Sequence, residues 1–146
     1  MSNGIDELES AIDSLLAVDP SELTDSELHE LVTGVQRQRH RLAAAAGAAI
    51  SSWDQRMVWA DNGAGSAAVR LANDTAASPS STGVEVKRAR RLRTMPHVAK
   101  ALSSGELSAD HVDLLARANQ PWRNASFADH EEMLVEQCKA LRFRDA

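Results

Sequence analysis

Residues 24–57 read TDSELHELVTGVQRQRHRLAAAAGAAISSWDQRM. Apolar residues recur along this stretch at alternating steps of four and three, which is the spacing of one face of an α-helix. Thr24 and Glu27 have the spacing of a capping box, in which each side chain accepts a hydrogen bond from the other residue's backbone N–H. We therefore expect one long amphipathic helix over about 24–57, roughly 50 Å long at 1.5 Å per residue.

A helix of this length cannot bury its own apolar stripe and requires a helical partner. Small residues at Ala43, Ala44, Gly47 and Ala48 would allow that partner to approach closely. The partner is either another helix of this chain or a second copy, so a monomeric bundle and a homodimer through helix 24–57 both remain open.

The rest of the chain also predicts an all-α fold, because alanine is abundant and no long run alternates as a strand does. Residues 1–20 predict an acidic N-terminal helix, and shorter helices are expected over about 97–103, 108–119 and from 126 onward. With 146 residues, the length fits a single helical domain over 1–146. The last helix has no stop signal, so we expect the domain to be truncated at its C-terminus.

The charge is strongly polarised along the chain, although the formal net charge is only −5. Residues 1–31 hold nine acids and no Lys or Arg, whereas residues 32–100 carry a net charge of +7. Local field rather than total charge attracts a polyanion. The middle of the chain is therefore compatible with DNA binding, and the acidic N-terminus is a candidate mask for it.

Residues 82–96 read TGVEVKRARRLRTMP and predict a basic helix. Thr82 and Glu85 again have capping-box spacing, and Met95-Pro96 ends the helix because a residue before proline avoids the α region. A small-residue helix over 66–76 and a turn at 78–81 precede it. Helix, turn and basic helix are the outline of a helix-turn-helix over about 66–95, within a DNA-binding segment 66–119.

Basic residues of this segment are the candidate contacts to double-stranded DNA. On the predicted helix the apolar arc holds Val86, Ala89 and Leu92, and Arg93 lies at its edge. The opposite arc and its flanks supply the candidates, which are Lys87, Arg88, Arg90, Arg91, Arg70 and Lys100. The alternative is an ordinary solvated face. The chain has only five aromatic residues, none beside the basic helix in sequence, which disfavours base stacking on single strands.

Two long stretches, RLAAAAGAAISSWDQRMVWADNGAGSAAVRLA (41–72) and VKRARRLRTMPHVAKALSSGELSADHVDLLARA (86–118), resemble a known family. It is the N-terminal domain of the HNH-endonuclease-signature proteins, also called domain-of-unknown-function family 222 or the thirteen-E-twelve repeat family. The resemblance implies a helical domain that precedes an HNH nuclease module in longer members. The residues from Val86 to His111 are also similar to the helix-turn-helix of ParB-type proteins, through the Leu92-to-Pro96 pattern and the Gly105-to-Ser108 corner.

The chain offers no evident catalytic site, metal site or cofactor site. The five histidines are scattered without metal-ligand spacing, and an HNH centre would need them in one compact unit. No glycine-rich phosphate loop, nucleophile elbow or small-molecule site is evident. A single cysteine, no secretory signal and no apolar run long enough for a bilayer predict a cytoplasmic protein without a membrane partner.

We therefore expect a DNA-binding module of an HNH-nuclease-type protein rather than an enzyme. Two alternatives remain open. One is a protein–protein interaction or dimerisation module, and the other is a remnant of a truncated nuclease gene.

Overall fold

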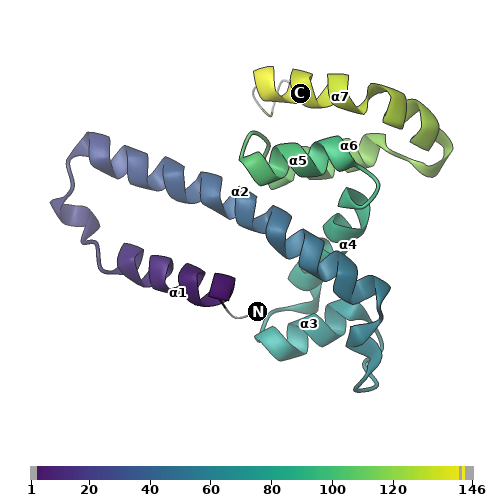
Figure 1. The fold of residues 1–146 in the computed structure, drawn as a ribbon, viewed down its shortest axis with the longest axis horizontal. Helices are drawn as coiled ribbons and strands as arrows, with labels where there is room; N and C mark the ends of the chain where they lie inside the picture. The colour runs from purple at the N-terminus through teal and green to yellow at the C-terminus, as the bar shows by residue number, and fades with distance from the viewer. Residues whose placement is uncertain (1–2, 142, 144–146) are drawn as a thin grey trace. The chain divides into compact units, whose positions relative to one another are not determined.

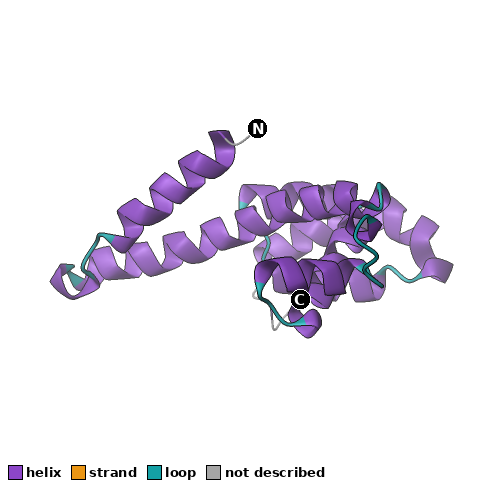
Figure 2. Ribbon diagram, turned by 90° about the horizontal axis from the view of Figure 1, so that it is seen from below, coloured by secondary structure: helices purple, strands orange, loops and turns teal. Residues whose placement is uncertain are grey.

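The computed structural model describes residues 3–141 and 143. In this part of the chain there are seven α-helices, three short 3-10 helices and no strand (Figure 2). The all-α prediction is confirmed. The chain divides into two compact units, residues 1–36 and residues 37–146.

Unit 1 consists of α1 (Asn3–Leu16), η1 (Pro20–Glu22) and the first part of α2 (Asp25–Gln55). The predicted capping box starts α2: Thr24 N–H donates to Glu27 Oε2 at 2.9 Å, and Glu27 N–H donates to Thr24 Oγ1 at 3.2 Å. The predicted long helix is therefore confirmed, with α2 starting one residue later and ending two residues earlier. No residue of α1 is buried.

Unit 2 contains the rest of α2 and all later elements. These are η2 (Val58–Ala60), α3 (Ala67–Thr75), α4 (Pro79–Leu92), α5 (Pro96–Ser104), α6 (Ala109–Ala118), η3 (Pro121–Arg123) and α7 (Asn124–Ala140). The helices expected at about 97–103, at 108–119 and from 126 onward correspond to α5, α6 and α7.

The hydrophobic core of unit 2 lies where α4 to α7 meet, and α5, α6 and α7 run side by side (Figure 1). Its largest fully buried side chains are Met95, Leu102, Leu107, Val98 and Val112. Burying such side chains is the main source of stability for short helices, which are marginal on their own. The C-terminal half of unit 2 is therefore a packed helical cluster.

Gly47 allows α2 to join this unit closely. It is the buried residue of α2, and a Cβ added there would lie 3.3 Å from Leu92 Cδ1 at the end of α4. A contact of that length is tighter than ordinary van der Waals packing. The small residues of α2 thus accommodate a helix of the same unit.

The start of α4 differs from the sequence prediction. The helix begins at Pro79, and Ser78 is its N-cap, accepting a hydrogen bond from Ser81 N–H at 3.2 Å. The capping box predicted at Thr82 and Glu85 is therefore wrong. Proline suits the first helical position, where its missing N–H costs nothing, so residues 79–81 are the first turn of α4 instead of a loop. Thr82 is buried, and its hydroxyl donates to Ala68 O at 2.8 Å.

The end of α5 is closed by glycine and by two arginines of α2. Gly105 has φ 81°, the left-handed conformation that glycine adopts without strain. Arg37 Nη2 donates to Ser104 O at 3.1 Å, and Arg41 Nε donates to Ser103 O at 3.0 Å. Cations at these last carbonyls also complement the helix dipole.

The start of α5 is satisfied by a buried carboxylate of α7. Met95, its N-cap residue, gives no side-chain cap, but Glu131 Oε1 accepts from Val98 N–H at 3.0 Å. Glu131 is only 2% exposed. An acceptor at a helix N-terminus satisfies a free N–H and is favoured by the dipole, so Glu131 ties α7 to α5.

Replacing Glu131 by alanine should lower the free energy of unfolding by about 1–3 kcal/mol, because it leaves a buried N–H without an acceptor. Glu131→Gln keeps a side-chain oxygen and should lose less. Urea unfolding followed by circular dichroism measures both. Glu132→Ala, at an exposed neighbour, is the control, and a loss of equal size in that variant would contradict the assigned role.

Candidate nucleic-acid interface

The basic helix predicted from the sequence is α4, and it is packed on several sides. It contacts α3, α5 and α6, and residues 76–78 join it to α3. Ala76 ends α3 in the left-handed conformation with φ 56°. The helix, short link and second helix expected over 66–95 are present, while their role as a DNA-reading helix-turn-helix stays a prediction.

Arg88 faces α6 and forms a two-point ion pair with Asp113. Arg88 Nε donates to Asp113 Oδ1 at 2.9 Å and Nη2 donates to Oδ2 at 2.8 Å. The Arg88 side chain is 18% exposed. The hydrogen bonds to Asp113 raise the pKa of Arg88 against the opposing effect of burial. A two-point pair of this kind fixes the guanidinium plane, so Arg88 joins α4 to α6.

Arg90 and Arg93 lie on another side of α4 and share the carboxylate of Asp54 in α2. Arg90 Nε and Nη2 each donate to Asp54 at 2.8 Å, and Arg93 Nη2 donates at 3.3 Å. Arg93 Nε also donates to Ser51 Oγ at 2.9 Å. The Asp54 side chain is only 11% exposed, and its pKa is lowered chiefly by the hydrogen bonds from Arg90.

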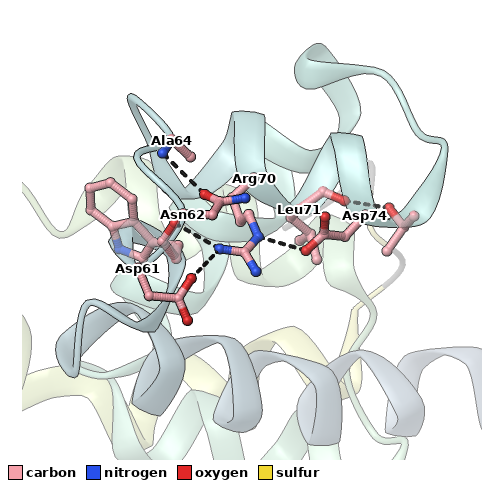
Figure 3. Close-up of polar contacts among 8 residues, drawn as sticks. Asp61, Asn62, Ala64, Arg70, Leu71 and Asp74 are labelled. Atoms are coloured by element: carbon pink, nitrogen blue, oxygen red, sulfur yellow. Dashed lines mark hydrogen bonds and ion pairs between the residues drawn. The ribbon is translucent and has the colours of Figure 1, made fainter.

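Arg70 lies in α3 and is also held by two carboxylates, one in the loop before α3 and one within α3 (Figure 3). Arg70 Nη1 donates to Asp61 Oδ1 and Nε donates to Asp74 Oδ2, both at 2.6 Å, and Nη1 also lies 3.3 Å from Trp59 O. The hydrogen bond to Asp61 is the main cause that raises the pKa of Arg70. Arg70 therefore anchors the turn at Asp61 to α3.

The other three candidates are arranged differently. Arg91 is half-buried, and its Nη1 donates to Asn119 O at 3.4 Å, a long contact to the end of α6. Lys87 and Lys100 are exposed and form no ion pair within the described residues. Lys100 lies on α5 beside a separate hollow that Arg41 and Arg93 also line. The structure therefore separates Lys100 from Lys87 and Arg91.

Lys87 and Arg91 belong to a surface hollow between α4 and α6, which we call the α4–α6 groove. Its volume is about 310 Å³, and it is lined by Val84, Lys87, Arg88, Arg91, Asp113, Ala116, Arg117 and Gln120. Within the described part of the chain, four cations line it against one acid, and both oxygens of that acid are already bonded to Arg88. The groove is thus a cationic surface with three basic side chains outside that pair.

Arg117 is the lining cation that the sequence analysis missed. It lies four residues after Asp113 on α6, so both side chains share one helix face. If the contact between Asp113 and α4 had been known, the position of Arg117 in the groove could have been predicted as well. That fact depends on the packing of α6 against α4, for which the sequence carries no local signal.

Histidine and acid positions give no sign of a metal centre in residues 3–141 and 143, where no three His, Cys, Asp or Glu are grouped for an ion. His111 has a structural role: its Nδ1 accepts from Ser108 N–H at 3.2 Å and completes the cap of α6. Burial lowers the pKa of His111. No helix in the described part of the chain is long and apolar enough to cross a bilayer.

Asp54→Asn should lower the free energy of unfolding by about 1–2 kcal/mol at neutral pH, because it removes the charged partner of Arg90 and Arg93. The folded-state pKa of Asp54 is depressed, so its contribution is present above the unfolded pKa of about 3.9 and is lost as the pH falls through the folded value. Urea unfolding at several pH values should show the difference between wild type and variant shrinking below about pH 4.

Asp74→Asn is the matched control, since Asp74 is 55% exposed and pairs with Arg70 within one helix. Exposed pairs contribute about 0–1 kcal/mol. A difference between wild type and Asp54→Asn that stays constant down to low pH would contradict the proposed Asp54 contribution.

Comparisons with known proteins place the chain in one family. No curated protein and no solved structure gives a significant match. A family model described as "Domain of unknown function (DUF222)" matches residues 29–144, most of the chain. The match agrees with the resemblance drawn from residues 41–72 and 86–118, whereas the similarity to ParB-type proteins stays a prediction. The chain belongs to the DUF222 family.

Proposed function

We propose that this chain is a DNA-binding module that holds the phosphate backbone of double-stranded DNA in the α4–α6 groove. The observation that carries the proposal is the excess of cations in the groove, where the one acid among the described lining residues is already bonded to Arg88. Phosphate contacts from Lys and Arg supply most of the affinity of non-specific DNA binding. The proposal gives the chain a binding role and no catalytic one.

The six candidate residues divide into three groups under this proposal. Lys87 and Arg91 contact phosphates, and Arg117, which is not among the six, is a third contact. Arg88, Arg90 and Arg70 are held by carboxylates at 2.6–2.9 Å and act as structural ties. Moving such an arginine to a phosphate would break its hydrogen bonds to the carboxylate, which costs free energy. Lys100 lies at another hollow and is outside the contact set.

The packing of α4 favours contact with the phosphate backbone of DNA over insertion of this helix into the DNA major groove to read the bases. Val86, Ala89 and Leu92 of α4 are buried, and its arginines are tied to α2 and α6. Of the α4 residues that line the groove, Val84 and Lys87 are exposed, while Arg88 and Arg91 are half-buried. Contacts to phosphate position a protein on DNA without selecting a sequence, so we expect weak sequence preference.

Binding should weaken with salt in proportion to three phosphate contacts. At about −0.9 per contact, the slope of log affinity against log salt should be about −2.7 for the wild type. That slope corresponds to a loss of about 40-fold between roughly 50 and 200 mM salt. Fluorescence anisotropy with a labelled duplex measures it.

Each of Lys87→Ala, Arg91→Ala and Arg117→Ala should reduce the slope by about one contact, and the triple variant should show no measurable binding. Lys100→Ala makes the same charge change at the other hollow and should leave the slope unchanged. Circular dichroism checks that each variant is folded. A triple variant with wild-type affinity would refute the groove as the binding surface.

Self-association through α2 is a second candidate, because α2 leaves apolar side chains exposed. Leu28 and Val32 in unit 1 are 36% and 54% exposed, and Leu42 in unit 2 is 45% exposed. Apolar residues at helical spacing along a long helix are typical of a surface that a second helix covers.

Sedimentation velocity tests this candidate. A dimer would sediment with twice the monomer mass of 15.8 kDa. The double variant Val32→Glu with Leu42→Glu should be monomeric, because a dimer would have to bury unpaired carboxylates in its interface. A wild-type chain that stays monomeric at the highest accessible concentration would exclude the homodimer.

A further inference from the structure

Trp122 is a large apolar side chain that the fold leaves in solvent. It lies in η3, between α6 and α7, and is 76% exposed. Trp53 and Trp59 are only partly exposed. Indole rings are usually covered because they bring a large apolar area. An exposed indole beside the proposed binding surface offers a large flat face for a contact.

The segment that carries Trp122 is tied to both helices of the α4–α6 groove. Asn119 at the end of α6 is buried, and its carbonyl accepts the 3.4 Å hydrogen bond from Arg91 of α4. Gln120 Nε2 donates to Arg117 O at 2.7 Å, and Arg123 N–H donates to Gln120 O at 2.8 Å. These bonds hold the start and the end of the turn around Trp122.

Trp122 is also close to the groove along the chain. Gln120 lines the groove, and two residues span at most about 7 Å at roughly 3.6 Å per residue. Arg123, directly after Trp122, is exposed. An aromatic ring is thus placed within reach of a row of cations, which is the combination used by proteins that bind unpaired nucleotides.

We propose that Trp122 stacks on an unpaired base of DNA whose backbone occupies the α4–α6 groove, so that the module favours DNA with a single-stranded end over a blunt duplex. This inference rests on the proposed function. The bases of a continuous duplex are stacked on one another, and taking one out costs free energy. An overhang presents a free base face, and stacking on an aromatic side chain tolerates any base.

A single-tryptophan variant reports this contact directly. The double variant Trp53→Phe with Trp59→Phe leaves Trp122 as the only indole. Trp59→Phe loses no hydrogen bond, because the buried indole N–H of Trp59 has no acceptor in the described residues. The probes are a blunt duplex and the same duplex with a short thymine overhang. We expect the overhang to quench Trp122 fluorescence strongly and the blunt duplex to quench it little, with circular dichroism confirming the fold.

Affinity measurements separate the inference from the proposed function. Trp122→Ala should weaken binding of the overhang duplex about 5- to 150-fold, the range for loss of one base–aromatic stack. Affinity for the blunt duplex and the salt slope should be unchanged, since the phosphate contacts remain. Trp122→Phe should keep most of the overhang affinity. Met133→Ala, at an apolar residue of α7 that is 50% exposed, should have no effect.

Three outcomes would overturn the inference. Equal overhang affinity in the wild type and Trp122→Ala would show that the ring does not stack, while blunt-duplex binding would leave the proposed function intact. Concentration-dependent burial of Trp122 without DNA would assign the ring to a protein contact. Absence of binding to either DNA by the wild type would refute the proposed function and, with it, the inference.

Discussion

The carboxylate of Asp54 binds both Arg90 and Arg93, and this clamp fixes α4 to α2 within unit 2. On another side of α4, Asp113 binds Arg88 with both of its oxygens and fixes α4 to α6. Between these ties, the buried face of α4 packs its small and branched side chains, and Gly47 lets α2 approach Leu92. The helix that is tied to both α2 and α6 is therefore also the basic helix α4.

This arrangement changes how the charge of the basic helix should be interpreted. Five basic residues lie between Lys87 and Arg93, yet three of them are paired with two carboxylates from other helices. Paired arginines make helix-to-helix contacts of fixed geometry. Their charge is largely balanced at short range. Of these five residues, Lys87 and Arg91 are in no ion pair within the described part of the chain, and both line the α4–α6 groove, where the packing of α6 adds Arg117.

Much of the fold could be predicted because its signals are local. Thr24 and Glu27 cap α2, Gly105 closes α5, and Ser108 caps α6, each through hydrogen bonds within a few residues. The predicted start of α4 was wrong, because Ser78 caps this helix and Pro79 lies in its first turn. Thr82 is instead buried and donates to Ala68 O in α3, a contact that no local pattern indicates.

By itself, the sequence determined the helical elements, the polarised charge and the family, because periodicity, caps and composition act over short distances along the chain. Only the tertiary structure decided which cations are paired and which line a groove. Asp54 and Asp113 are 36 and 25 residues from the arginines Arg90 and Arg88 that they bind. Likewise, Trp122 is distant from the basic helix in sequence, and the hydrogen bond from Arg91 to Asn119 brings its loop to α4. Pairing of charges depends on distance in space, and the chain alone does not encode that distance in any local pattern.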